Sequence, residues 1–173
     1  MSIFDFNSIS EAVYKGTIPN PDWVLVPEGE YLAQCTKLEG REVESTRMQQ
    51  TYLFVELTWE IMDDAVKAAC NMEHPSARQS FSLNMTERPP YQLDLGPNQN
   101  MALKAVWRAC GVTIDPTISK IRHQTAYVRV EHEPMLRDGS QMLDMDGKPQ
   151  YRATVTRVTS IEAARRTRPN GGA

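Results

Sequence analysis

Several features that would assign this chain of 173 residues to a class of protein are scarce or missing. Its three cysteines are too few and too scattered for a disulfide framework, and each lies among apolar neighbours, which favours a reducing cytosol. The sequence has no run of 18 apolar residues and starts without a basic leader, so we expect neither a membrane span nor export. We therefore expect a cytoplasmic protein.

Signatures of catalysis are also missing. The sequence contains no G-x-x-x-x-G-K-[ST] phosphate loop, no G-x-S-x-G elbow, no H-E-x-x-H pair and no G-x-G-x-x-G turn. Its acidic residues are spread over separate loops, whereas a metal-dependent nuclease would group them around its ions. We therefore predict that the protein is not an enzyme and needs no cofactor.

Two short patterns resemble metal sites but are incomplete. Cys70 and His74 have a spacing that zinc accepts, yet no second close pair accompanies them. Asp144 and Asp146 resemble the start of a calcium loop, but the later carboxylate ligands are missing, so a tight Asp-Gly turn is the simpler interpretation. Asp138-Gly139 is a second such turn, and the two turns could frame a small hairpin. We predict no metal site.

The composition indicates one soluble globular domain, with 40% apolar residues, 24% charged residues and a net charge of −3. That charge is unevenly distributed. Residues 1–100 hold 7 lysines and arginines against 15 acidic residues, whereas residues 101–173 hold 12 against 7. An anion-binding surface should therefore draw mainly on the C-terminal half.

Alternation of apolar and polar residues predicts five strands. They cover residues 30–38, 52–61, 78–85, 125–133 and 150–158. Residues at helical spacing lie between the third and fourth strands, and Gly111 ends that helix: Leu103, Val106, Trp107 and Cys110. Residues 62–77 could be a short helix or an irregular insertion.

Three strands, one helix and two further strands are the element order of an oligonucleotide/oligosaccharide-binding (OB) barrel. We therefore predict a mainly β fold, a five-stranded OB-type barrel with one helix between strands 3 and 4, plus an N-terminal extension. The extension covers residues 1–28, the OB domain residues 29–160 and a basic flexible tail residues 161–173. Loops 39–51 and 134–149 occupy the positions that commonly hold ligand in this fold.

Three stretches carry a family resemblance: "PEGEY" opening a strand, "YLFVELTWEI" as the next, and "LKAVWRACGV" closing a helix. They resemble the small OB-type single-stranded-DNA-binding proteins encoded by bacteriophages, in particular a family from phage replication and recombination gene clusters, over about residues 27–160. The resemblance implies sequence-tolerant binding and protection of single-stranded DNA in the host cytoplasm, with phage replication or recombination proteins as further partners. Many such proteins end in an acidic tail, whereas this chain ends in "RRTRPNGGA".

The outward side of residues 52–61 is the candidate binding face. Tyr52 and Phe54 lie two residues apart, about 7 Å along a strand, which suits the stacking of successive bases. Glu56 and Glu60 on the same side would repel phosphates and limit binding to the Tyr52 end. Phosphate contacts are predicted for eight basic residues: Arg41, Arg47, Arg78, Arg129, Arg137, Lys148, Arg152 and Arg157.

Other interpretations stay open. The two outward rings could be covered by the aromatic residues of the extension, Phe4, Phe6, Tyr14 and Trp23, or could lie in a homo-oligomer interface. The protein could instead be a virion structural or scaffold β-barrel protein without nucleic-acid binding, which would form a fixed oligomer. A metal-dependent nuclease is the third and least favoured hypothesis.

Overall fold

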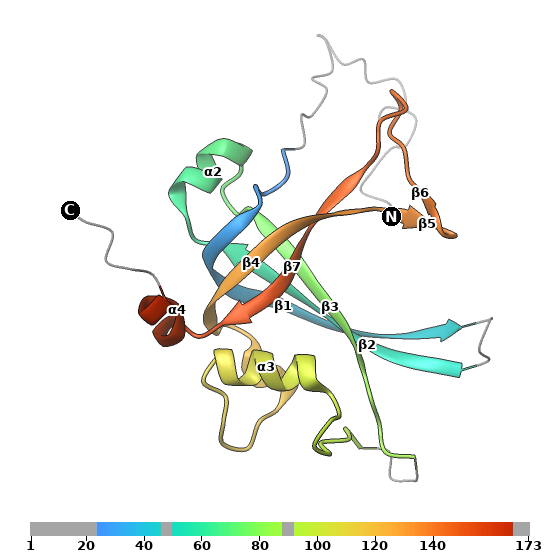
Figure 1. Ribbon diagram of the computed structural model, residues 1–173, viewed down its shortest axis with the longest axis vertical. Helices are drawn as coiled ribbons and strands as arrows, with labels where there is room; N and C mark the ends of the chain where they lie inside the picture. Colours follow the sequence, from blue (N-terminus) through green and yellow to red (C-terminus); the bar gives the residue numbers. More distant parts are fainter. Residues whose placement is uncertain (1–23, 46–49, 88–91, 168–173) are drawn as a thin grey trace, which may run out of the picture.

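Five strands of the computed structural model, which describes residues 24–45, 50–87 and 92–167, form a mixed sheet that closes in a ring (Figure 1). The order around the ring is β1-β2-β3-β7-β4. The bounds are Gly29–Ser45 for β1, Gln50–Ile61 for β2, Ser76–Leu83 for β3, Thr125–Pro134 for β4 and Tyr151–Thr159 for β7. The fold is mainly β, as the alternating pattern predicts.

The ring is uneven because its junctions differ in length. β1 pairs with β2 from Ala33 to Ser45, but with β4 only from Gly29 to Gln34. The junction of β3 and β7 is parallel and joined by one residue pair, Arg78 with Thr154. The far parts of β1 and β2 therefore project from the ring as a two-stranded arm, on the right of Figure 1.

The first strand is longer than the sequence predicts. Residues 39–45, expected to belong to a loop, continue β1 and pair with β2 as far as Ser45 opposite Gln50. The expectation was wrong because this polar stretch shows no alternation of apolar and polar residues. It still forms a strand, because hydrogen bonds to β2 satisfy its backbone N–H and C=O groups whatever the side chains are. Arg41 consequently lies on a strand.

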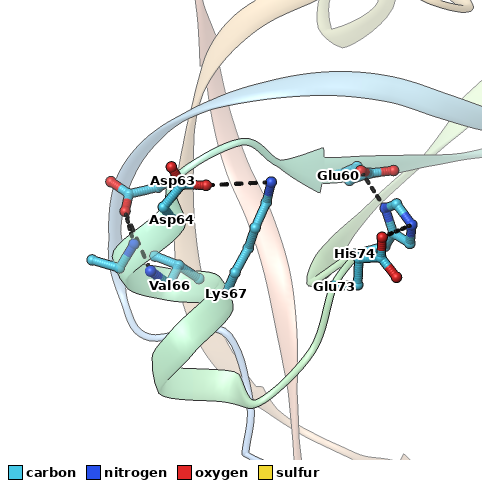
Figure 2. Close-up of polar contacts among 8 residues, drawn as sticks. Glu60, Asp63, Asp64, Val66, Lys67, Glu73 and His74 are labelled. Carbon is cyan, nitrogen blue, oxygen red and sulfur yellow. Dashed lines mark hydrogen bonds and ion pairs between the residues drawn. The ribbon is translucent and has the colours of Figure 1, made fainter.

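The helix predicted between the third and fourth strands is confirmed as α3, Met101–Ala109, and a 3-10 turn follows at Ile118–Ile121. The undecided segment 62–77 contains α2, Asp64–Cys70. Its first turn is capped by Asp63, whose Oδ1 accepts hydrogen bonds from the backbone N–H groups of Ala65 at 2.9 Å and Val66 at 3.3 Å (Figure 2).

The prediction of a flexible tail from residue 161 is wrong for its first half, because α4 covers Ile161–Thr167. Ser160 Oγ caps the helix by accepting from the N–H of Ala163 at 3.1 Å, and Ala164 is buried. A basic, alanine-containing stretch therefore folds where a cap and a buried contact are available. Residues 168–173 lie outside the described part of the chain.

The turn predicted at Asp138-Gly139 is confirmed, and it closes a hairpin by itself; the second Asp-Gly turn lies inside a separate bridge between Leu143 and Pro149. Strands β5, Leu136–Arg137, and β6, Ser140–Gln141, are joined by Asp138 and Gly139, both with positive φ. Figure 1 shows that this hairpin projects on the same side of the view as the β1–β2 arm.

The core lies inside the ring and against α3. Four inward residues of β2 are at most 1% exposed, Val55, Leu57, Trp59 and Ile61, whereas the inward Leu53 is partly buried. The indole N–H of Trp59 donates to Gln79 Oε1 at 3.1 Å, so its burial leaves no polar atom unpaired. α3 adds Leu103, Val106 and Trp107 to the same core. Within the described ranges, no helix is long and apolar enough to span a membrane.

Candidate nucleic-acid interface

Tyr52 and Phe54 point away from the core, on what we call the outer face: the outward residues of β1, β2 and β3. Both are half-buried, whereas the next inward residue, Val55, is 1% exposed. The strand register places Arg41 of β1 and Ser82 of β3 on either side of Phe54. One aromatic ring therefore lies between a guanidinium and a hydroxyl on three adjacent strands.

The outer face becomes charged beyond Phe54, but its charges are paired. Glu56 Oε1 accepts from Arg78 Nη1 at 3.2 Å, and Lys37 Nζ lies 2.9 Å from Glu39 Oε1. The carboxylate expected to repel phosphate is thus partly neutralised. Arg78 commits one of its five N–H donors to Glu56 and keeps others for a phosphate.

Glu60, the second carboxylate of the outer face, is also paired. Its Oε1 lies 2.7 Å from Nδ1 of the exposed His74, and Glu73 Oε1 lies 3.9 Å from the other ring nitrogen (Figure 2). The hydrogen bond and the charge of Glu60 raise the pKa of His74. A protonated His74 would offset the charge of Glu60, so this end of β2 repels phosphates less when the imidazole carries its proton.

The predicted phosphate-binding residues do not form one continuous track. Arg129 and Arg157 are brought together as cross-strand partners on β4 and β7. Arg129 Nε donates to Glu131 at 2.8 Å, and Arg152 Nη2 donates to Glu133 at 3.3 Å. Arg129 and Arg152 would therefore have to divide their N–H donors between these carboxylates and a phosphate.

The remaining predicted cations lie elsewhere. Arg137 and Lys148 are exposed in the segment that contains the β5–β6 hairpin, far along the chain from the outer face. Arg41 is exposed on β1 opposite Phe54, and Arg47 lies outside the described residues. The structure therefore separates the described cations into three groups: the outer face with Arg41 and Arg78, the hairpin segment, and β4 with β7.

One further cation was missed by the sequence analysis. Arg108, in the last turn of α3, lines a shallow hollow of about 280 Å³ together with Arg157. The sequence carries no signal for this pairing, because a single arginine on the outward side of a helix is usually only solvated.

A groove of about 950 Å³ lies beside Tyr52, where β2, β3 and the segment after β3 meet. We call it the Tyr52 groove. Among the described residues its lining is Glu42, Tyr52, Leu53, Leu83, Asn84, Met85, Glu87, Asp94 and Gln99. No periodicity in the sequence could reveal it, since four separate segments contribute to it: β1, β2, β3 with the residues after it, and the segment before α3.

Asn100 holds the wall of this groove in place. It is 6% exposed, and its Nδ2 donates to the carbonyls of Asn84 at 2.9 Å and Asp94 at 2.7 Å. Its Oδ1 accepts from the N–H of Asn84 at 2.8 Å. Asn100 also has φ of 50°, a left-handed conformation that asparagine tolerates better than most residues. In the sequence, the asparagine-rich stretch "GPNQN" before the helix was the signal that could have indicated such a position.

The residues of the weak zinc pattern have separate partners. Cys70 is buried, with its Sγ 3.7 Å from the carbonyl oxygen of Leu25, while His74 pairs with Glu60. Among the described residues there is no group of three or more His, Cys, Asp or Glu able to hold a metal. Burial raises the pKa of Cys35 to about 11 and that of Cys110 to about 12, so both thiols stay protonated at neutral pH.

Hydrogen bonds to His132 hold the residues just before β1, at the opposite end of that strand from the residue that pairs with Tyr52. His132 Nε2 lies 2.8 Å from the carbonyl oxygen of Val26, and the N–H of His132 donates to Glu28 Oε1 at 2.8 Å. Tyr52 instead pairs with Val43, near the other end of β1. The four aromatic residues expected to cover the rings belong to residues 1–23, outside the described part of the chain, so that interpretation stays a prediction.

Neither a protein-family model nor a curated protein sequence matches this chain. The residues of the site therefore carry the functional argument.

Proposed function

We propose that this protein is an OB-type barrel that binds and protects single-stranded DNA during phage DNA replication or recombination, with tolerance of sequence. The ring order and the single helix between the third and fourth strands support the OB assignment. In that fold the face of strands 2 and 3 and the loops beside it commonly hold an oligonucleotide. Tyr52 and Phe54 lie on the corresponding face.

The observation that carries the proposal is the arrangement around Phe54. Its half-buried ring lies between Arg41 and Ser82, and Tyr52 follows two residues further along the strand. Bases stack on such rings whatever their identity, while the neighbouring guanidinium can bind the phosphate between them. A platform of this kind binds single strands in preference to duplexes, whose bases are already stacked.

Cations outside the outer face would extend the contact. Arg78 of β3 lies opposite Thr58 and pairs with Glu56. The β5–β6 hairpin segment supplies Arg137 and Lys148, and Arg129, Arg152 and Arg157 lie on β4 and β7. We include them as phosphate contacts of the proposal. It involves no catalytic step and no cofactor. It places the protein in the host cytoplasm, alone or as a homo-oligomer, with replication or recombination proteins as further partners.

The test compares the double variant Tyr52→Ala/Phe54→Ala with Tyr127→Ala, a control that removes a half-buried outward tyrosine from β4. We expect the double variant to lose at least about tenfold in affinity for a fluorescent single-stranded oligonucleotide, since each stacked base contributes ~1–3 kcal/mol. The control should bind as the parent does. Circular dichroism would show that all three proteins are folded, and equal binding by all three would contradict the proposal.

One observation favours the alternative of a virion structural or scaffold protein. The segment around the β5–β6 hairpin exposes apolar side chains, with Leu136 61%, Leu143 55% and Met145 102% exposed. Such residues suit an assembly surface. A fixed oligomer without affinity for single-stranded DNA, duplex DNA or RNA would support that function, whereas magnesium-dependent degradation of the oligonucleotide would support a nuclease.

A further inference from the structure

The shallow hollow where α3 packs against the end of β7 brings two arginines together (Figure 1). Arg108 comes from the last turn of α3 and Arg157 from β7, and both side chains are exposed. Two guanidinium groups that share one space repel each other, and a bound anion relieves that repulsion. The hollow therefore suits an anion.

Both guanidinium groups have their donors available. Within the described part of the chain, neither an ion pair nor a side-chain hydrogen bond engages Arg108 or Arg157. By contrast, Arg129, the cross-strand partner of Arg157, donates to Glu131. A guanidinium carries five N–H donors in a planar fork that matches two oxygens of a phosphate group. The two arginines could therefore bind one phosphate from two sides.

Hydroxyl groups and the small volume of the hollow also suit a phosphate. Thr159 and Ser160 line it beside the arginines. Ser160 Oγ accepts from the N–H of Ala163 at 3.1 Å, which leaves the O–H of Ser160 to donate. The volume of about 280 Å³ lies just below the range of ~300–1,000 Å³ that encloses whole small molecules. The hollow therefore has room for a phosphate group but leaves the rest of a nucleotide outside.

The hollow lies beyond the two rings of the outer face. The ring order places β3 between β2, which carries Tyr52 and Phe54, and β7, which carries Arg157. Two strand spacings of ~4.8 Å separate β2 from β7 before any side chain is counted. A phosphate in the hollow would therefore belong to a nucleotide further along the strand than those that stack on Tyr52 and Phe54.

The strand directions place the hollow and Phe54 towards the same end of the ring. β3 and β7 are parallel, and they are joined where Arg78 lies opposite Thr154. Ser82, the neighbour of Phe54, and Arg157 both lie further along in the shared direction, towards α3 (Figure 1). A single strand that leaves Phe54 across β3 can therefore reach α3 and β7 without crossing to the other end of the ring.

A polynucleotide fits this hollow better than free phosphate does. Exposed charges in an open hollow are screened by water and salt, so a free phosphate ion would bind only weakly. A phosphate joined through its own strand to bases on Tyr52 and Phe54 is held near the hollow at a high effective concentration. The contact with the arginines then adds to the affinity of the whole strand.

We propose that Arg108 and Arg157 bind one backbone phosphate of the strand whose bases stack on Tyr52 and Phe54, a few nucleotides away from those bases. This inference rests on the proposed single-stranded-DNA binding. It adds Arg108 to the binding residues, and it requires a strand long enough to reach from β2 to β7.

The experiment compares two fluorescent single strands of mixed sequence, one of about 4 and one of about 16 nucleotides, which span the site sizes of OB folds. Fluorescence anisotropy at neutral pH and several salt concentrations gives both affinities. The parent protein should bind the long strand more tightly. In Arg108→Gln/Arg157→Gln that advantage should fall several-fold, and the slope of log affinity against log salt for the long strand should decrease by about 0.7, the value for one phosphate contact.

The matched control is Lys67→Gln/Arg122→Gln. It removes the same charge from α2 and from the residue after the 3-10 turn, both outside the hollow. The control should keep the advantage of the long strand. Circular dichroism would show that both variants are folded, as expected for substitutions of exposed arginines.

The outcomes separate this inference from the proposed function. Binding of neither strand by the parent contradicts the proposed function itself. If Arg108→Gln/Arg157→Gln keeps the full advantage of the long strand, or if the control loses as much of it, the phosphate site alone is overturned. A titration at high protein concentration counts the strands bound per chain, and one is expected. Two long strands on the parent and one on Arg108→Gln/Arg157→Gln would assign the hollow to a second strand and also overturn the inference.

Discussion

Arg41 and Phe54 lie directly opposite each other on β1 and β2, which places a guanidinium beside an aromatic ring on the outer face. Within the described residues no ion pair engages Arg41, in contrast to Arg78 and Arg129. Its positive charge is therefore available to a phosphate at the point where a base would stack.

This relationship predicts the behaviour of Arg41→Gln. Loss of one phosphate contact should weaken binding of single-stranded DNA at low salt and reduce the slope of log affinity against log salt by about 0.7. The comparison is Arg122→Gln, which removes an equal charge from an exposed position after the 3-10 turn. Anisotropy titrations at several salt concentrations measure both. Equal slopes for the two variants would mean that Arg41 acts only through the net charge of the protein.

The sequence predicts the core of this fold better than its surface. Alternation fixes the inward set of β2 because Leu57, Trp59 and Ile61 cannot face water without losing much of the free energy of folding. The same reasoning places Tyr52 and Phe54 outward. It fails for residues 39–45, since a polar strand in a projecting arm has no apolar side to reveal it.

Ion pairs and the Tyr52 groove could not be predicted in this way. The pairing of Glu56 with Arg78 depends on the register of β2 and β3, which no single strand specifies. The groove depends on Asn100, whose hydrogen bonds join residues 6 and 16 positions away. Sequence patterns report the burial of single elements, whereas the site arises from contacts between elements.

Asn100 is predicted to be a main determinant of stability near the groove. Asn100→Ala should lower the free energy of unfolding by about 3 kcal/mol, because it leaves the N–H of Asn84 without its side-chain partner and puts alanine in a left-handed conformation. Asn100→Gly should cost about 1 kcal/mol less, since glycine adopts that φ freely. Urea denaturation measures both.

Asn71 provides the control for this effect. It has a similar φ of 51° at the C-cap of α2, but it is exposed. Asn71→Ala should therefore show only the backbone penalty, about 1 kcal/mol. If Asn100→Ala were no more destabilising than Asn71→Ala, the buried hydrogen bonds of Asn100 would contribute nothing measurable.

The contact between His74 and Glu60 predicts a pH dependence. The hydrogen bond to Glu60 raises the pKa of His74 above its ordinary value of about 6.5, so folding favours the protonated imidazole. The resulting stabilisation is fully present below about pH 6.5 and is lost as the pH rises through the folded-state pKa. The side chain of His74 is 67% exposed, so the effect on stability should be small, and the direct measurement is an NMR titration of its ring protons.

Two substitutions separate the partners of His74. Glu60→Gln should return the pKa of His74 towards 6.5, whereas Glu73→Gln should lower that pKa less, because Glu73 lies 3.9 Å away and contributes only its charge. Equal shifts in the two variants, or an ordinary pKa in the parent, would show that the Glu60 contact is not formed in solution.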